Sequence, residues 1–195
     1  MKKILFLILL FHTSAFSQDL GKAYFAGGCF WCMEESFEKK EGVLEVISGY
    51  SGGKTTKPTY EEVTYGNTGH FETIEIIFDK NIINYQDLLD HFWKNIDPFD
   101  KYGQFCDKGY SYRSVAFYQD QKQKDLIKKS IQKLELKFNK KIVTYLRKFD
   151  KFHKAEDRHQ NYYKVKFLIR GKRSKITFLF SIQCSSFKSK LSKLL

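Results

Sequence analysis

The sequence predicts one domain of the α/β or α+β class, in which helices cover a small sheet. Strand-like apolar runs alternate with amphipathic helical segments in the order β-α-β, β-α, β-α-β. The 195 residues include only two prolines, and no Gly/Ser-rich linker or repeat divides the chain. Aromatic residues make up 17% of the chain, which excludes intrinsic disorder although 29% of the residues are charged.

The first predicted strand, residues 22–26, is a short apolar run that ends at two glycines. A helix is predicted over residues 30–40, because apolar residues recur there at positions i, i+3 and i+7. Residues 43–50 form the second predicted strand, and a loop rich in Gly, Thr and Lys follows over residues 51–59. Alternation of apolar residues then predicts a strand over residues 72–78.

The second half of the chain follows the same logic. Residues 84–95 have an amphipathic helical pattern, with Asn84 as the candidate N-cap. A Gly-containing loop over residues 97–112 precedes a strand at 114–118 and a Lys-rich helix at 121–138. The last predicted elements are a strand at 141–146 and a short helix at 157–164.

The amino terminus has the pattern of a secretory signal peptide. Two lysines precede the apolar run 4–11, and Ala15 and Ser17 stand at positions −3 and −1 of a cut before Gln18. The run is too short to span a bilayer, which takes about 20 apolar residues. We therefore expect a signal peptide over residues 1–17, export to a periplasm, and no stable membrane insertion after cleavage. The folded domain is then 18–165, followed by a basic tail of uncertain order over 166–195.

Cys29 is the strongest candidate for chemistry. Two glycines allow a sharp turn between strand and helix, which places Cys29 at the helix N-terminus. Free N–H groups and the helix dipole stabilise an anion there, so we expect a lowered thiol pKa and a nucleophilic sulfur. The alternative is a buried structural cysteine. Cys32 completes a Cys-x-x-Cys, which suits dithiol redox chemistry. Zinc needs about four ligands at defined spacing, and the remaining cysteines stand alone, so no metal is expected.

Glu72 is the candidate proton donor. Strand parity places its side chain on the same face as Ile74, Ile76 and Phe78. Burial raises the pKa of a carboxylic acid, so a buried Glu72 can stay protonated and donate a proton. The alternative is a partly solvated position at the mouth of the strand.

Three further polar residues lie in predicted loops. Tyr60 and Tyr112 carry hydroxyl groups, and Asp107 stands five residues before Tyr112. Taken alone, each tyrosine is better interpreted as a packing residue.

Seven motifs together resemble a known family. They are GGCFWC (27–32), GxxxVxSGYSGG (42–53), PTYEEV (58–63), GHFE (69–72), DPFD (97–100), GQFCDKGYSYRS (103–114) and AEDRHQNYY (155–163). In this order they resemble the peptide methionine sulfoxide reductases of the A type. The resemblance runs from about Lys22 to Tyr163. It implies a two-layer α/β plait, with a ferredoxin-like core and a mixed sheet.

The resemblance also implies the activity and the site. The implied reaction is the reduction of methionine-S-sulfoxide, free and in proteins, and it needs no metal or organic cofactor. Apart from the resemblance, we expect the protein to be a monomer. Roles carry over by motif position: Cys29 as nucleophile, Glu72 as acid, Phe30 and Trp31 as the apolar pocket for the substrate methyl group, and Tyr60, Tyr112 and Asp107 as the polar side. A thiolate attacks the sulfoxide sulfur, Cys29 becomes a sulfenic acid, and a second thiol forms a disulfide that a thioredoxin-like dithiol reduces.

The sequence leaves the resolving cysteine open among three residues. Cys32 lies one helical turn from Cys29, Cys106 adjoins Asp107, and Cys184 depends on the tail folding back. We rank Cys32 first. Many family members have Gly at the position of Cys32, so we expect the recycling scheme to be particular to this chain. The chain also departs from the family at Ser111, where Gln is common.

Two other classes of function are weighed against this one. A thiol–disulfide oxidoreductase could use the Cys-x-x-Cys, but a thioredoxin-like protein also needs a cis-proline loop, and neither Pro58 nor Pro98 precedes a suitable strand. A nucleic-acid-binding module could use the formal net charge of +12, but no nucleic-acid motif is present. The lysines spread along residues 121–141 and the tail, as on a solvated face, so no nucleic-acid partner is expected.

Overall fold

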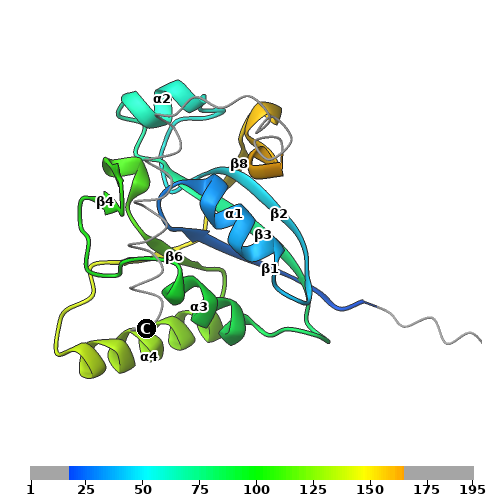
Figure 1. Ribbon diagram of the computed structural model, residues 1–195, viewed down its shortest axis with the longest axis vertical. Coiled ribbons are helices and arrows are strands. Elements are labelled where there is room, and N and C mark those ends of the chain that lie inside the picture. The colour runs from blue at the N-terminus through cyan, green and yellow to red at the C-terminus, as the bar shows by residue number, and fades with distance from the viewer. Residues whose placement is uncertain (1–17, 165–195) are drawn as a thin grey trace, which may run out of the picture.

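The computed structural model describes residues 18–164, and a six-stranded mixed sheet forms its centre (Figure 1). The strand order is β7-β6-β1-β3-β2-β8; β6 and β7 run parallel, and the other neighbours are antiparallel. The strands are β1 (Leu20–Ala26), β2 (Val43–Ser51), β3 (Phe71–Asp79), β6 (Val115–Tyr118), β7 (Tyr145–Lys148) and β8 (Phe152–Lys154). A separate two-stranded ribbon pairs β4 (Gly103–Gln104) with β5 (Asp107–Lys108).

Three helices pack on one face of this sheet and give the predicted mixed α+β class. They are α1 (Phe30–Glu38), α3 (Tyr85–Lys94) and α4 (Gln121–Phe138). Their buried side chains join one apolar cluster with Ile74 and Ile76 of β3. Burial of such side chains is the main force that holds the layers together. The short helices α2 (Tyr60–Tyr65), η1 (Tyr110–Tyr112) and η2 (Asp157–His159) lie in the connections.

Strand β3 lies between β1 and β2, so both of its edges are paired, and its side chains are buried on nearly the whole of both faces. Glu72 is 1% exposed, on the same side as the apolar residues Ile74 and Ile76. The burial expected from strand parity is thus confirmed. On the opposite face, Phe71 belongs to a second apolar cluster with Phe117 of β6.

Most predicted elements are confirmed, and the differences are local. Helix α4 has the predicted bounds, and α3 begins after Asn84, whose side chain accepts from the Asp87 N–H in a capping box. The strand predicted at 141–146 was wrong in position, because pairing with β6 begins at Tyr145. Of the short helix predicted at 157–164, residues 157–159 form the 3-10 helix η2, residues 160–161 form a turn, and residues 162–164 are α-helical.

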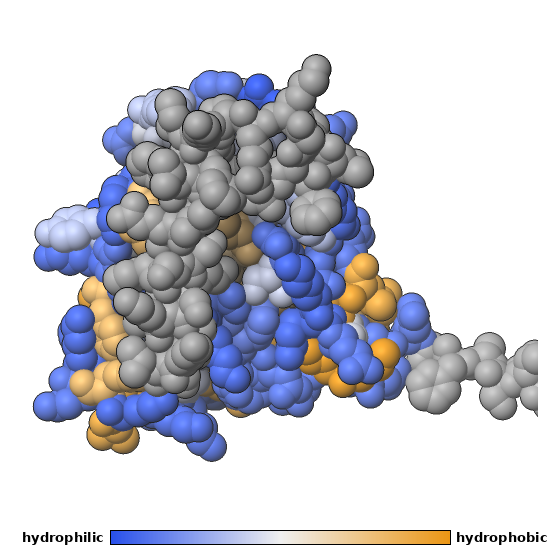
Figure 2. Space-filling view, in the orientation of Figure 1, coloured by the Kyte–Doolittle hydropathy of each residue, from blue (hydrophilic) through white to orange (hydrophobic). Residues whose placement is uncertain are grey.

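Polar and charged residues dominate the described part of the face in Figure 2, with scattered apolar ones. The large apolar side chains that are exposed include Leu20, Leu44 and Ile82. Within residues 18–164, no helix is long and apolar enough to cross a membrane.

Candidate active site

Cys29 lies where β1 turns into α1, as the sequence predicts. Gly28 makes the turn with a φ of +84°, a region that favours glycine, and Cys29 is the N-cap of α1. Its backbone carbonyl accepts from the N–H groups of Cys32 and Met33. The residue as a whole is half-buried, and its thiol lies deep enough for burial to raise its pKa.

The turn is held from outside by Gln104. A Cβ placed on Gly28 would lie 2.6 Å from the Gln104 Cβ, so the two backbones approach closely here. The Gln104 side chain is buried and bonded twice to Asp97: its Oε1 accepts from the Asp97 N–H at 2.6 Å, and its Nε2 donates to the Asp97 carbonyl at 2.8 Å. The loop after α3 therefore fixes the position of the turn that carries Cys29.

The first free N–H of α1 binds Glu72. The Phe30 N–H donates to Glu72 Oε2 at 2.9 Å, whereas the Cys29 side chain caps no backbone group. The other carboxyl oxygen, Oε1, is buried and has no hydrogen-bond partner. Burial raises the pKa of Glu72 to about 8, against the opposing effect of the Phe30 N–H. At neutral pH this carboxyl therefore holds a proton next to the nucleophile.

The Cys29 thiol does not have the lowered pKa expected from its place at a helix N-terminus. Its pKa is raised well above the ordinary value by a side-chain hydrogen bond with Cys32, by burial, and by the charges of Cys32, Glu72 and Asp107. The free N–H at this helix end is used by Glu72 instead, which explains why the expectation was wrong. Protonation of Glu72 removes one of the charges that oppose thiolate formation.

The three candidate resolving cysteines differ in place and state. Cys32 is exposed on the first turn of α1, is in the thiol form, and shares the hydrogen bond with Cys29. Cys106 lies on the exposed turn between β4 and β5 and is disulfide-bonded. Cys184 lies outside the described residues. Of the two candidates within the described residues, Cys32 is the one hydrogen-bonded to Cys29.

Two tyrosines and an aspartate surround Glu72 and Cys29, as the resemblance implies. A side-chain hydrogen bond joins Tyr60 and Tyr112, and both phenols sense the charges of Glu72 and Cys29. Burial raises the pKa of both tyrosines, so each keeps its hydroxyl proton. Burial also raises the pKa of Asp107, which in turn raises that of Glu72.

Phe30 and Trp31 form an aromatic wall beside the thiol. Phe30 is fully buried, and Trp31 is half-buried with a ring centroid 5.8 Å from that of Phe30. The resemblance assigned no role to two further members of this wall. His159 stacks on Tyr60 with centroids 4.4 Å apart, and Tyr162 stacks on Trp31 at 3.9 Å. Both belong to the motif AEDRHQNYY, whose aromatic residues were the signal available in the sequence.

Within residues 18–164, no group of three or more His, Cys, Asp or Glu side chains could hold a metal ion. The expectation that the reaction needs no cofactor rests on the chemistry of the thiol and the carboxyl, and it stays a prediction.

Comparison with known proteins identifies the family. The sequence profile of peptide methionine sulfoxide reductase matches residues 21–183. Relatives named peptide methionine sulfoxide reductase MsrA include one from Listeria monocytogenes serotype 4b, 48% identical over 149 residues (75% of this chain and 84% of the relative). Another, from Streptococcus equi subsp. zooepidemicus, is 46% identical over 144 residues (73% of this chain and 85% of the relative).

Solved structures agree with the sequence comparison. Mxr1 from Saccharomyces cerevisiae in reduced form superposes with a TM-score of 0.70 at 27% identity, covering 75% of this chain and 85% of that chain. Methionine sulfoxide reductase A of Corynebacterium diphtheriae gives 0.69 at 27% identity, covering 76% of each. Fold and site define a thiol-based oxidoreductase. The chain belongs to the peptide methionine sulfoxide reductase family, A type. This membership leaves the thiol–disulfide oxidoreductase and nucleic-acid alternatives without support.

Proposed function

We propose that this chain reduces methionine-S-sulfoxide, free and in proteins, with Cys29 as nucleophile and Glu72 as acid. The observation that carries the proposal is the second oxygen of Glu72, buried without a hydrogen-bond partner beside Cys29, on a carboxyl whose pKa is about 8. A sulfoxide oxygen is a poor leaving group until it is protonated, and a neutral carboxylic acid can supply that proton.

The reaction then proceeds in two steps. The Cys29 thiolate attacks the sulfoxide sulfur while Glu72 protonates the oxygen. The resulting hydroxyl group then moves from the methionine sulfur to the Cys29 sulfur as the bond between the two sulfurs breaks, so methionine leaves and Cys29 becomes a sulfenic acid. Phe30 and Trp31 supply apolar surface for the substrate methyl group, and the hydroxyls of Tyr60 and Tyr112 face the polar side. The sulfenic acid next condenses with a thiol, which forms a disulfide and releases water.

We assign the resolving step to Cys32. Its thiol is already hydrogen-bonded to Cys29 and is exposed, so the resulting disulfide is open to an external dithiol. A thioredoxin-like protein is the reductant that the family resemblance implies.

The first experiment measures methionine formed from each sulfoxide epimer by the wild type and by Cys29→Ser. We expect reduction of the S epimer by the wild type and none by the variant, because serine cannot replace the thiolate. Reduction of the R epimer, or activity that survives in Cys29→Ser, would refute the proposal.

The second experiment separates reduction from recycling with Cys32→Ser. This variant should form one equivalent of methionine per Cys29 but lose turnover with thioredoxin, because no neighbouring thiol removes the sulfenic acid. Cys106→Ser is the matched control and should keep its turnover. Full multiple turnover in Cys32→Ser would contradict the assignment.

We also propose that the enzyme acts as a monomer in a periplasm, to which residues 1–17 direct it. The support is the signal-peptide pattern and the cut it predicts before Gln18. Fractionation of cells that express the chain with and without residues 1–17 tests this: only the full chain should reach the periplasm, with Gln18 as its first residue.

A further inference from the structure

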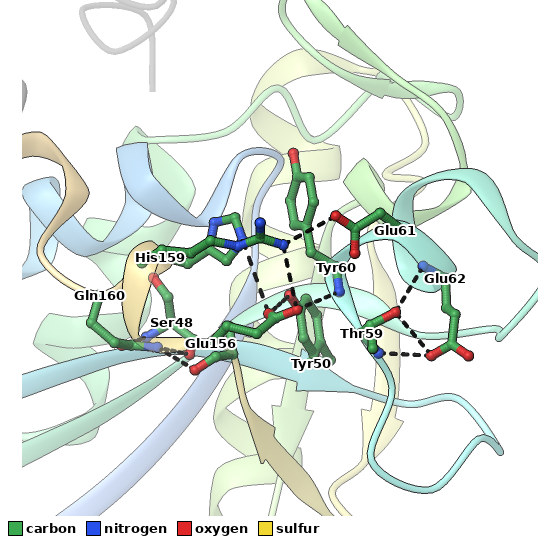
Figure 3. Close-up of polar contacts among 11 residues, drawn as sticks. Ser48, Tyr50, Thr59, Tyr60, Glu61, Glu62, Glu156, His159 and Gln160 are labelled. Atoms are coloured by element: carbon green, nitrogen blue, oxygen red, sulfur yellow. Dashed lines mark hydrogen bonds and ion pairs between the residues drawn. The ribbon is translucent and has the colours of Figure 1, made fainter.

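Glu156 joins three parts of the chain beside the site. It follows β8 and precedes η2, and its carboxylate is half-buried (Figure 3). Its Oε1 accepts from the Tyr60 N–H at 2.9 Å, and its Oε2 accepts from the Tyr50 hydroxyl at 2.9 Å. Tyr50 belongs to β2 and is fully buried, so one end of this bridge is fixed in the core.

The bridge controls where α2 begins. Tyr60 is the first residue of α2, and a backbone N–H at that position has no partner inside the helix. A helix of six residues is too short to be stable alone, so its place depends on tertiary contacts. The capping box of Thr59 and Glu62 satisfies the N–H groups of those two residues, and Glu156 satisfies that of Tyr60.

The same segment supports the Tyr60 ring. His159, three residues after Glu156, is 5% exposed and stacks on that ring. Figure 3 shows Glu156 next to the backbone end of Tyr60 and His159 beside its ring. The segment that carries Glu156 therefore holds both the helix start and one face of the phenol.

The groups around Glu156 favour its ionised form, in which both carboxylate oxygens accept hydrogen bonds. Arg158 lies 3.8 Å from Oε1 and pairs with Glu61 at 3.1 Å, while His159 Nε2 lies 3.9 Å from Oε2. That Nε2 accepts from the Arg158 Nε–H, so the imidazole is neutral. Burial alone would raise the pKa of Glu156, but the hydrogen bonds from Tyr60 and Tyr50 lower it.

We propose that Glu156 is a positioning residue for the reductase step: it holds the Tyr60 hydroxyl next to Glu72 and Cys29 by fixing the first residue of α2. This inference rests on the proposed function, in which the Tyr60 hydroxyl belongs to the polar side of the site. Glu156 itself stays away from the reacting atoms and acts through hydrogen-bond geometry, not through its charge.

Three substitutions separate geometry from charge. Glu156→Asp keeps the charge but is one methylene too short to reach both Tyr60 and Tyr50. Glu156→Gln loses the charge but keeps the reach, because its Oε1 accepts from the Tyr60 N–H and its amide donates to the Tyr50 oxygen. Glu156→Ala removes both bonds. Glu61→Ala is the matched control on α2, since Glu61 contacts Arg158 and leaves the Tyr60 N–H untouched.

The measurement is the single-turnover rate of methionine formation at saturating sulfoxide. Glu156→Asp and Glu156→Ala should lose about 10- to 100-fold, the scale of a misplaced catalytic group. Glu156→Gln and Glu61→Ala should stay within about twofold of the wild type. When Glu156→Asp is added to Tyr60→Phe, the rate should fall by less than about twofold further, because the hydroxyl that Glu156 positions is already absent.

Each contrary result overturns the inference. Wild-type rates of methionine formation in Glu156→Asp and Glu156→Ala would show that Glu156 does not matter, and a rate for Glu156→Gln as low as that of Glu156→Ala would show that its charge matters. The inference also fails if Glu156→Asp slows Tyr60→Phe as much as it slows the wild type. It fails as well if Tyr60→Phe alone keeps the wild-type rate. Should Glu156→Ala fail to fold, Glu156→Asp and Glu156→Gln carry the comparison. If the wild type forms no methionine, the proposed function and this inference both fail. If the wild type is active but the effects of Glu156→Asp and Tyr60→Phe on the rate are additive, this inference alone fails.

Discussion

Glu72 is buried on the helix-covered face of the sheet, and its pKa is raised from 4.5 to about 8. Between these two values the folded protein binds one more proton than the unfolded chain. The free energy of unfolding therefore decreases as pH rises from 4.5 to about 8 and stops changing through this group above that range. The burial that suits Glu72 to the proposed proton transfer thus lowers the stability of the fold toward pH 8.

Glu72→Gln tests this at the level of one residue. The amide is neutral at every pH, so the variant should gain stability relative to the wild type as pH rises through that window, and it should lose methionine formation. Urea denaturation at a series of pH values measures the first effect, and a single-turnover assay measures the second. Glu75→Gln, on the same strand but the opposite face, is the control for the activity measurement and should keep its methionine formation. A stability difference that does not change with pH would contradict the burial argument.

The turn between β1 and α1 predicts a second outcome, at the scale of an element. Gly28→Ala should destabilise the fold and slow methionine formation, because its Cβ would press on Gln104 and displace the start of α1. Gly69→Ala is a matched control: its φ of +72° is also left-handed, but its Cβ would lie 3.6 Å from the nearest atom, an ordinary contact. Thermal unfolding should show an extra cost of about 1–3 kcal/mol for Gly28→Ala over Gly69→Ala. An equal loss of stability in the two variants would mean that the Gln104 side chain can move away from the new methyl group at little cost in free energy.

Elements with long periodic patterns could be predicted from the sequence, and short ones could not. The apolar spacing and N-cap of α3 and α4 gave the right positions, since each helix buries a full stripe. Helix α2 was missed because six residues show no periodicity, although Thr59-x-x-Glu62 is a capping-box signature. Strand β7 was misplaced because its position depends on the pairing of Tyr145 with Val115, which lies 30 residues away in the chain.

The candidate site shows the same division. Cys29 and Glu72 could be found because a local turn and strand parity mark them. Glu156 and His159 meet Tyr60 across nearly 100 residues of chain, a contact that no local pattern encodes. The raised pKa of Cys29 has a different origin: its largest causes are the hydrogen bond with Cys32, three residues away, and burial, and the charges of Glu72 and Asp107 from distant strands add less.

The charge of the whole molecule predicts a third outcome. A formal net charge of +12 repels itself, and the ion pairs of residues 18–164 are mostly exposed, where each contributes about 0–1 kcal/mol. Raising NaCl to about 0.5 M should therefore raise the melting temperature, because salt screens the repulsion more than it weakens the pairs. A variant with Gln at the exposed positions Lys128, Lys129 and Lys133 should show a smaller increase. A melting temperature that falls with salt would show that the ion pairs dominate.

The hydrogen bond from the Phe30 N–H to Glu72 makes the backbone of α1 a sensor of the reaction. When Glu72 gives up its proton, the acceptor of that bond becomes an anion, and a charge-assisted hydrogen bond is shorter and stronger. The Phe30 amide resonance should then move downfield in an NMR spectrum, and its exchange with solvent deuterium should slow. The signal of the Phe30 amide, next in sequence to the proposed nucleophile, would therefore show whether Glu72 is protonated or deprotonated during turnover.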